Sequence, residues 1–523
     1  MRTLNDSTQT AFDTMSTGYF RYPVHQLLIS WLRKIGADSF GVVGLSTVNN
    51  ALVKGENQII TPTDTFEFFD ETENAIRVEY DRRVEEPLGG LSFGLTNVVL
   101  DNTDKRFTPN YNATIGTALI PNRPLKIALG FNLKDGKKMM EIFKGLTEMP
   151  KENKVDRTVE FGGMDYVSYL RDLEMKSVVY SSMRSDEIIE EILIEAGFGS
   201  SQYVLDVGLN TLGFVWFKSG ETASERIKKI CEAEEGHFFQ DEMGILRFQN
   251  RRKYSYAPYN AIQKYIHDND ILDWIGIEDV GIYNSVLVNA SPRKIYDTNV
   301  EVWRDGIVEE IYAKDSLVIT ASMKEPTYSF EDPVGGVDFV ANSASDGSGT
   351  DLTANITITL VGYAENAQLT IVNNGTQKTY ITFLRLKGKP ALVTSEIQQK
   401  YEDNASIARY GKRILNIEND FIDSDSFAYY LARTTVGKYK DPLKRIRILI
   451  RGMPQLQLKD KLSVYDRDLG TYKLYRIMGI QGIFQTGEFL QYLTLREVTS
   501  YEADSWAIVG TTLVGAEREY VGV

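Results

Sequence analysis

Apolar and polar residues alternate at a period of two in segments spread along the whole chain. Clear examples are AIRVEY at residues 75–80, NITITL at 355–360 and QLTIV at 368–372. This period places the apolar side chains on one face of an extended strand, whereas a helix needs a period near 3.6. The 29 Tyr and 24 Phe residues favour the same outcome, because flat rings pack well on a pleated surface. We therefore expect a mainly β protein.

Two segments have the spacing of amphipathic helices instead. In SDEIIEEILIEAG, residues 185–197, apolar residues recur three and four positions apart, and Gly197 is placed to end the helix. TASE at 222–225 matches a capping box, in which a hydroxyl and a carboxylate satisfy the free amides of the first turn. The tetrapeptide DEMG at 241–244 lies between apolar runs and predicts a tight hairpin. We expect a small α+β domain at residues 183–255.

The region from 327 to 387 differs in composition from the rest of the chain. It is poor in charge and rich in Gly, Asn, Ser and Thr, and its alternating segments predict an inserted β-sandwich. Two helices are predicted beyond it. One begins near Asp403, and the other begins near Asp425 with Phe427 and Leu431 facing inward. For the first helix, Ile407, Tyr410 and Ile414 are the residues expected to face inward.

The remaining segments complete a division into four units. A short helix is predicted at 7–16, followed by strands at 25–32 and 39–44, and strands also close the chain. The predicted units are an N-terminal arm with a first β domain at 1–182, the α+β domain at 183–255, a second β domain with two helices at 256–326 and 388–523, and the inserted sandwich at 327–387.

The formal net charge of −14 limits the partners of the chain. An acidic surface repels phosphate, so nucleic-acid binding through counterion release and docking on an anionic membrane are both unlikely classes of function. No apolar run approaches the ~20 residues that span a bilayer, and the N-terminus lacks the apolar core of a signal peptide. We expect the chain to fold in a cytoplasm.

The residue types that commonly carry catalysis or bind metals are few. His25, His237 and His267 are far apart in sequence, and a packed or surface histidine is the favoured interpretation of His237. Cys231 lies on an apolar helix face beside several glutamates, which favours core packing over a reactive thiolate. We expect no zinc site and no cofactor.

A calcium site and a catalytic pair of carboxylates are harder to exclude from the sequence pattern. Asp101 and Asp104, and the group Asp420, Asp423 and Asp425, offer oxygen ligands at short spacing but lack the EF-hand pattern, so turns and helix caps explain them better. No P-loop, dinucleotide fingerprint or G-x-S-x-G nucleophile motif is present. A glycosidase needs only two suitably spaced carboxylates, which sequence spacing among 72 acidic residues cannot identify. We name no catalytic, cofactor-binding or metal-ligating residue.

Several motifs are spread along the chain. They are VEEPLGGLSFG at 84–94, DNTDKRFTP at 101–109, IPNRP at 120–124, FEDPV at 330–334, DGSGTDLT at 346–353, LRLKGKP at 384–390 and GMPQLQLKDKLSV at 452–464. These motifs resemble those of minor tail or tail-tip (baseplate) hub proteins of tailed phages and prophages. The matches lie in both halves of the chain. The resemblance implies two tail-tube-like β-barrel or sandwich domains and a smaller α+β domain. It also implies that three copies form a ring whose six β domains match a hexameric tail tube.

The resemblance also implies a set of partners and a location. The expected partners are two further copies of the chain in a homotrimer, the tail tube and distal tail proteins, the tape measure protein, and the tip or fibre proteins. The expected location is the virion tail tip, after assembly in the host cytoplasm. Many relatives carry a peptidoglycan-cutting domain, but this chain ends shortly after its last predicted strands, so we expect none here.

Three functions follow as hypotheses. The first is a structural, non-enzymatic hub that forms part of the DNA-exit channel, whose acidic wall would keep DNA from adhering during ejection. The second is a tail-associated cell-wall or glycan hydrolase that uses two facing carboxylates. The third is a receptor- or carbohydrate-binding tail protein that acts through exposed aromatics of the 327–387 sandwich, although a small sandwich needs several of these rings for its own core.

Overall fold

The computed structural model describes residues 23–33, 66–84, 90–498, 507–509 and 512–514, apart from short gaps at 110, 112–114, 116–118, 134–135, 177, 256–257 and 486. The helix predicted at 7–16 and the strand predicted at 39–44 lie outside these residues. Within them the chain is mainly β, with a smaller α+β part, as the alternation predicted.

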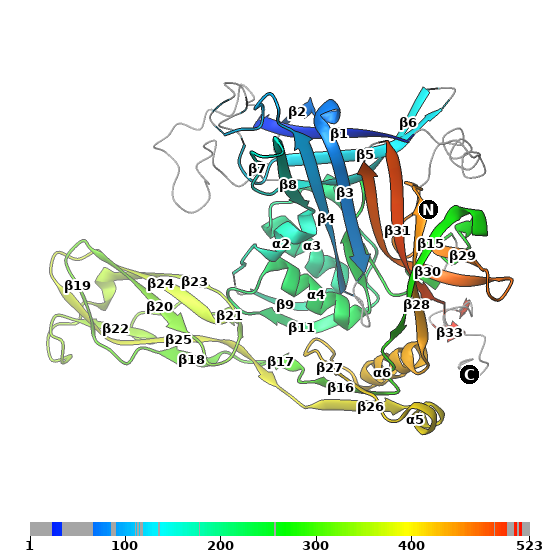
Figure 1. Cartoon of the computed structure of the whole chain (residues 1–523). Coiled ribbons are helices and arrows are strands. Elements are labelled where there is room, and N and C mark those ends of the chain that lie inside the picture. The colour runs from blue at the N-terminus through cyan, green and yellow to red at the C-terminus, as the bar shows by residue number, and fades with distance from the viewer. Residues whose placement is uncertain are drawn as a thin grey trace.

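A single hydrogen-bonded sheet forms the body of the molecule (Figure 1). Its main strands are β1 (Pro23–Arg33), β2 (Phe66–Asp70), β3 (Ala75–Val84), β4 (Gly90–Asp101), β5 (Pro124–Leu133), β6 (Gly136–Thr147), β7 (Lys151–Asn153), β8 (Thr158–Met164), β14 (Lys264–Ile266), β15 (Ile271–Val280), β28 (Leu443–Arg451), β29 (Lys461–Asp466), β30 (Thr471–Gln485) and β31 (Glu488–Glu497). Neighbouring strands follow the order β2, β1, β5, β6, β8, β4, β3, β30, β31, β28 and β15.

The two halves of this sheet come from opposite ends of the chain. Strand β3 pairs with β30 in antiparallel register, from Arg77 opposite Gln485 to Arg83 opposite Gly479. Residues 85–470 separate the two strands in sequence. The strands that the sequence assigned to two β domains therefore belong to one continuous sheet.

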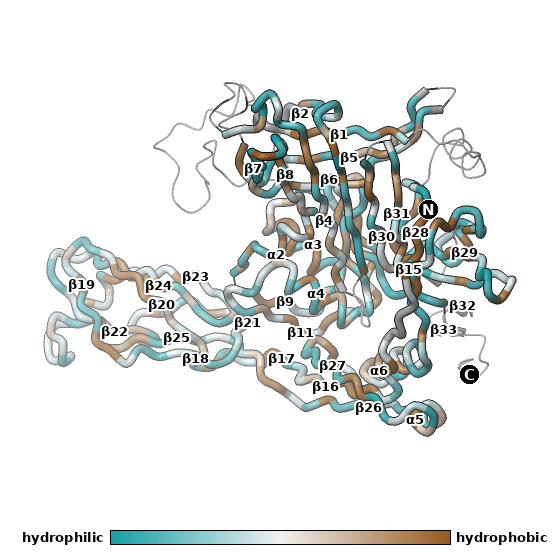
Figure 2. The backbone as a smooth tube through the Cα atoms, viewed as in Figure 1, coloured by the Kyte–Doolittle hydropathy of each residue, from teal (hydrophilic) through white to brown (hydrophobic). Residues whose placement is uncertain are grey.

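The same two halves bury a common core. Val78, Leu100 and Ile127 from the first half and Ile448 and Leu493 from the second half are fully buried in one cluster. Figure 2 shows apolar residues along the body strands, in alternation with hydrophilic ones. Each half therefore supplies part of the apolar surface that the other half needs to exclude water.

The α+β unit packs on one side of the sheet. It comprises α2 (Tyr166–Arg171), β9 (Val178–Arg184), α3 (Ser185–Glu195), β10 (Tyr203–Leu205), β11 (Thr211–Phe217), α4 (Ala223–Glu234), β12 (His237–Gln240) and β13 (Leu246–Gln249). The predicted capping box is confirmed at α4, where Thr222 accepts a hydrogen bond from the Glu225 amide and the Glu225 carboxylate accepts one from the Thr222 amide. The predicted hairpin is confirmed as the antiparallel pair β12 and β13.

A β-sandwich arm projects away from the body (Figure 1). Its strands are β17 (Arg293–Ile295), β18 (Val300–Arg304), β19 (Glu309–Ile311), β20 (Ser316–Ser322), β21 (Thr327–Phe330), β22 (Phe339–Asn342), β23 (Ile356–Gly362), β24 (Asn366–Asn373) and β25 (Thr379–Val393). One sheet contains β20, β24 and β23, and the other is built around β25. Residues from both sheets share one core, which includes Ile311, Leu369 and Leu384.

The pairing within the arm begins earlier than the composition suggested. Strand β17 pairs with β25 from Arg293 onward, and β20 pairs with β24 along its whole length. Charged residues such as Lys294, Glu301 and Arg304 lie in this upstream part of the arm, so its composition differs from that of the charge-poor region after 327. The division of the chain into folding units at residue 327 stays a prediction, whereas the observed strand pairing spans 293–393.

A small layer joins the arm to the body. Strands β16 (Ser285–Ala290), β26 (Ile397–Glu402) and β27 (Ile414–Glu418) form a sheet that packs against α6 (Asp425–Tyr439), and α5 (Asn404–Tyr410) follows β26. Both predicted helices are present, and Leu431 is buried as expected. The inward orientation predicted for Ile414 is wrong. Gly411 ends α5 in a positive-φ conformation, and Ile414 opens β27 with its side chain exposed.

Replacing Leu493 with alanine should lower the free energy of unfolding by about 2–5 kcal/mol, because the side chain is fully buried in the shared core. Amide hydrogen exchange should accelerate in β3 and β4 as well as in β31. Val318→Ala, at an exposed position of β20, is the control and should change stability by less than about 0.5 kcal/mol. Faster exchange confined to the strands after residue 443 would contradict a shared core.

Candidate functional site: the buried junction and the open end of the sheet

A buried polar junction connects the sheet to the α+β unit. Strand β12 adds to the end of β4 in parallel, with His237 opposite Gly90 and Phe238 opposite Leu91. The backbone pairing covers only these positions. Side chains that cross from one unit to the other supply further polar contacts.

Arg82 on β3 is the central cation of this junction. Its guanidinium forms an ion pair of 2.6 Å with Glu242 and donates a 2.9 Å hydrogen bond to the carbonyl of Gln240. Both charged side chains are nearly inaccessible to solvent. The Gln240 side chain continues the network, accepting from the Tyr166 amide at 2.7 Å and donating to the Lys144 carbonyl at 2.6 Å. The β12–β13 hairpin is thus held to two strands and one helix.

Asp165 links α2 to the same sheet. Its carboxylate caps the helix by accepting from the Ser168 amide at 2.8 Å and also accepts from the Gly94 amide of β4 at 2.5 Å. Burial raises the pKa of Asp165 to about 6, although these hydrogen bonds and the positive charge of Arg82 act in the opposite direction. The carboxylate is therefore held in place by backbone donors at an electrostatic cost.

Ser92 and His237 form a pair that sequence reasoning did not anticipate. The Ser92 hydroxyl lies 2.6 Å from Nε2 of His237, and the histidine stacks on the ring of Phe239. Burial lowers the pKa of His237 well below its usual range, and the nearby cations Lys459 and Arg82 lower it further. Both side chains are buried, and Nδ1 of His237 has no hydrogen-bond partner among the described residues. The pair is closed to solvent, and no carboxylate in the described part of the chain hydrogen-bonds to the ring as in a catalytic triad.

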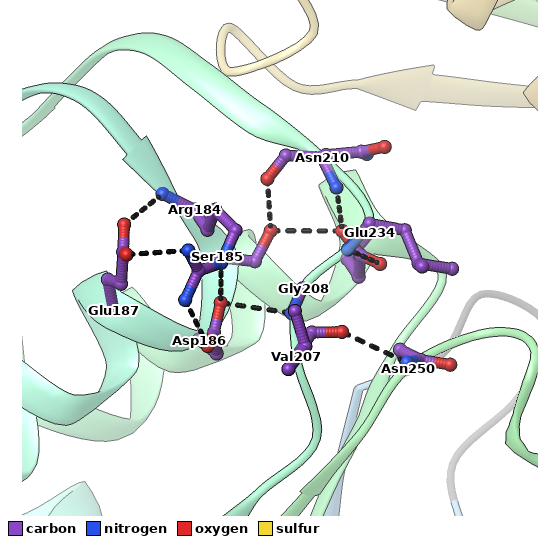
Figure 3. Close-up of polar contacts among 10 residues, drawn as sticks. Arg184, Ser185, Asp186, Glu187, Val207, Gly208, Asn210, Glu234 and Asn250 are labelled. Atoms are coloured by element: carbon purple, nitrogen blue, oxygen red, sulfur yellow. Dashed lines mark hydrogen bonds and ion pairs between the residues drawn. The ribbon is translucent and has the colours of Figure 1, made fainter. Parts of the chain in front are cut away.

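A second buried carboxylate, Glu234, organises the interior of the α+β unit (Figure 3). It accepts hydrogen bonds from the Ser185 hydroxyl at 3.0 Å and from the amides of Leu209 and Asn210 at 2.9 and 3.0 Å. Arg251 lies 3.3 Å away as its ion-pair partner. Burial raises the pKa of Glu234, and the Arg251 charge opposes that shift. This carboxylate joins the starts of α3 and β11 to the end of α4.

The other candidates from the sequence occupy structural positions. Cys231 is buried, and burial together with Glu234 and Glu232 raises the pKa of its thiol well above the usual range. The core-packing interpretation of Cys231 is therefore confirmed. Nε2 of His25 lies 3.1 Å from the Thr72 carbonyl, and Nδ1 of His267 lies 2.6 Å from the Tyr472 hydroxyl. The three histidines do not meet.

The candidate calcium ligands accept hydrogen bonds from the protein itself. Asp101 and Asp104 each accept a backbone amide two residues ahead, as in Asx turns. Asp420 accepts from the Ser291 amide, Asp423 from the Gly213 amide and Asp425 from the Gln399 side chain. Across the part of the chain that the structure describes, no group of three or more His, Cys, Asp and Glu residues is arranged to hold a metal ion.

The end of the main sheet at β15 is the second feature of the site. The register of β15 against β28 shifts twice, and the extra residues at these bulges are Leu272 and Ile275. These two side chains are 44% and 43% exposed. Bulges interrupt the regular row of backbone groups on an edge strand, so β15 is suited to contact through side chains more than to simple strand addition.

The chain is similar to several solved structures. No protein-family model matches the sequence, and no curated protein matches it. Among the described residues, no helix has the length and apolar character needed to cross a membrane.

The crystal structure of a tail protein from Neisseria meningitidis is 12% identical, with a TM-score of 0.48, and the match covers 84% of this chain and 95% of that one. A 43 kDa tail protein of prophage MuSo2 from Shewanella oneidensis is 11% identical, with a TM-score of 0.42 and coverage of 84% and 97%. The prophage tail protein gp18 from Listeria monocytogenes is 7% identical, with a TM-score of 0.37 and coverage of 82% and 91%.

Replacing Arg82 with methionine should destabilise the protein by about 3 kcal/mol, because it removes a buried ion pair and a buried hydrogen bond together. Amide exchange should accelerate in β12 and β13 first. Arg83→Met is the matched control, since Arg83 forms an exposed pair with Asp81 whose loss should cost less than about 1 kcal/mol. Equal urea midpoints for the two variants would contradict a structural role for the buried pair.

Asp165→Asn should change how stability depends on pH. Because the folded-state pKa of Asp165 is about 6 and its ordinary value is 3.8, the folded protein binds the proton more tightly. This tighter proton binding stabilises the folded protein fully below the ordinary pKa of 3.8, and the stabilisation is lost as pH rises through 6. The free energy of unfolding lost in this way is about 3 kcal/mol. The stability of the asparagine variant relative to the native chain should therefore improve from about pH 4 to about pH 7. Urea unfolding at several pH values measures this, and a pH-independent difference would contradict it.

Proposed function

We propose that the chain is a structural hub of a bacteriophage tail tip or baseplate. In this proposal it joins the tail tube to the tip or fibre as a homotrimer and lines part of the DNA-exit channel. The proposal has two supports: the sequence motifs that resemble tail-hub proteins, and the way in which the main sheet is built. It assigns no catalytic residue.

The β3–β30 pairing carries the proposal. It joins β strands from the first and last parts of the body into one continuous wall that ends at β15. A ring requires each subunit to offer two different surfaces, because head-to-tail contacts close when the rotation between copies is suitable. A wall of two β halves per subunit suits the expected match of three copies to the six positions of a tail tube.

The arm and the acidic charge of the chain also fit the proposed hub. The arm extends away from the wall, where it can reach tip, fibre or distal tail proteins without entering the ring (Figure 1). The net charge of −14 suits a channel past which DNA slides, since like charges oppose adhesion. We expect the tape measure protein to meet the chain at the channel.

A non-enzymatic role is favoured by the chemistry of the described residues. The Ser92–His237 pair is buried, and the Cys231 thiol is buried with a raised pKa. A nucleophile needs access to its substrate and a partner that activates it. A zymogram on host cell walls separates this proposal from a hydrolase, because clearing by the purified chain would contradict it.

The oligomeric mass of the purified protein tests the hub directly. Sedimentation velocity should give three times the mass of one chain, and the double variant Leu272→Glu with Ile275→Lys should shift this species to the monomer. Charges placed at these exposed apolar side chains would lose their hydration in the subunit contact. Val318→Glu with Val361→Lys, at exposed positions of the arm, is the control and should remain trimeric.

Each outcome has a separate meaning for the proposal. A native chain that stays monomeric at high concentration and is missing from intact virions would overturn the hub function. A double variant that remains trimeric would overturn only the assignment of the contact to β15.

A further inference from the structure

The outer face of the sheet formed by β14, β29 and β30 is aromatic. Strand β14 pairs with β29 in parallel, with Tyr265 opposite Ser463, and β29 pairs with β30, with Tyr465 opposite Tyr472. The opposite face of these strands supplies Ile266, Leu462, Val464 and Tyr475 to the main core. Because side chains alternate along a strand, Tyr265, Tyr465 and Tyr472 project from the side that faces away from the core.

These rings contact one another but remain accessible. Tyr472 lies 5.9 Å from Tyr265, 5.9 Å from His267 and 5.3 Å from Tyr465, measured between ring centroids. Tyr265 is 50% exposed and Tyr472 is 42% exposed. The outer face of a half-buried antiparallel sheet is usually polar. We call this set, Tyr265, His267, Tyr465, Tyr472 and Leu474, the tyrosine face.

The chain itself passes the edge of the tyrosine face. After β31 the amide of Val498 donates a 2.9 Å hydrogen bond to the carbonyl of Leu474. Leu474 is two residues from Tyr472 on the same strand, so the segment that follows Val498 begins beside the tyrosine face. Eight residues, 499–506, then lead to β32 (Ala507–Val509), a length that can span roughly 26 Å when extended.

The segment that follows has the composition needed to cover such a face. Residues 505–516, SWAIVGTTLVGA, carry no charged side chain. Strand β32 pairs in antiparallel register with β33 (Thr512–Val514), and the two strands pair only with each other in the described structure. An isolated two-stranded hairpin is marginally stable in water and gains stability by packing on an apolar face.

We infer that the β32–β33 hairpin of the same chain docks on the tyrosine face. An uncharged hairpin can cover the rings without losing the hydration of a charge, which a strand from most other parts of this acidic chain could not do. Tyrosine rings suit such a contact because they bury apolar area while their hydroxyls keep polar partners. The inference concerns the fold of a single copy and does not depend on the hub function.

Amide hydrogen exchange on the full chain tests this contact. The variant Tyr265→Ser with Tyr472→Ser removes two exposed rings, so it should leave the main core intact. The amides of 507–509 and 512–514 should exchange on the order of tenfold faster in this variant than in the native chain. Exchange in β31, the strand that leads into the segment, should be unchanged.

Tyr312→Ser with Tyr328→Ser is the matched control, because both rings are exposed on the arm. It should leave exchange at 507–514 as in the native chain. The hairpin inference is overturned if the tyrosine-face variant and the native chain exchange equally at these amides, or if the native amides are unprotected.

The concentration dependence separates the same chain from a second copy. Protection of 507–514 in the native chain should be independent of protein concentration under conditions in which sedimentation shows a constant mass. Protection that rises together with the mass would assign the tyrosine face to an intermolecular contact and would overturn the inference. A trimer that forms normally in the tyrosine-face variant, with faster exchange at the hairpin, supports the inference and leaves the hub proposal unaffected.

Discussion

The pairing of β3 with β30 is the constraint on which the rest of the structure depends. It joins the strands β1–β8 to the strands β28–β31, so that the two groups complete one sheet and one core. The units between these strands must then leave and re-enter the body at fixed places. The α+β unit enters through β4 and β12, and the arm leaves through β16 and returns through β26. A chain without this pairing would have two further sheet edges, at β3 and β30, and two incomplete cores.

Buried polar groups add directionality to the apolar core. Arg82, Gln240 and Asp165 contact partners whose positions are fixed within hydrogen-bond distance, whereas apolar packing tolerates small displacements. A buried charge without its partner would be strongly unfavourable. The β12–β13 hairpin, α2 and the sheet must therefore keep the arrangement in which Arg82 and Asp165 reach their partners. The raised pKa of Asp165 indicates that burial opposes the charge of the carboxylate that supplies this directionality.

Local features of the fold could be predicted from the sequence, whereas long-range pairings could not. Alternation located β3, β23 and β24, and the TASE motif located the start of α4, because both signals depend on neighbouring residues. The Arg82–Glu242 pair and the Ser92–His237 pair join residues more than a hundred positions apart, and nothing in the local pattern marks them. The error at Ile414 has a local cause, since the turn at Gly411 ended the helical period before that residue. The pairing of β17 and β20 with strands beyond residue 365 is likewise long-range, and no local pattern marks it.

The long strand β25 has a mechanical consequence for the arm. It runs without interruption for 15 residues and pairs in succession with β19, β22, β18, β21 and β17. A pull along the axis of β25 loads these hydrogen bonds in shear, so they resist together and do not open one after another. Tension applied at the outer end of the arm therefore travels along one strand to β26 and the layer beneath α6. The arm can act as a stiff tether between whatever it holds and the body of the protein.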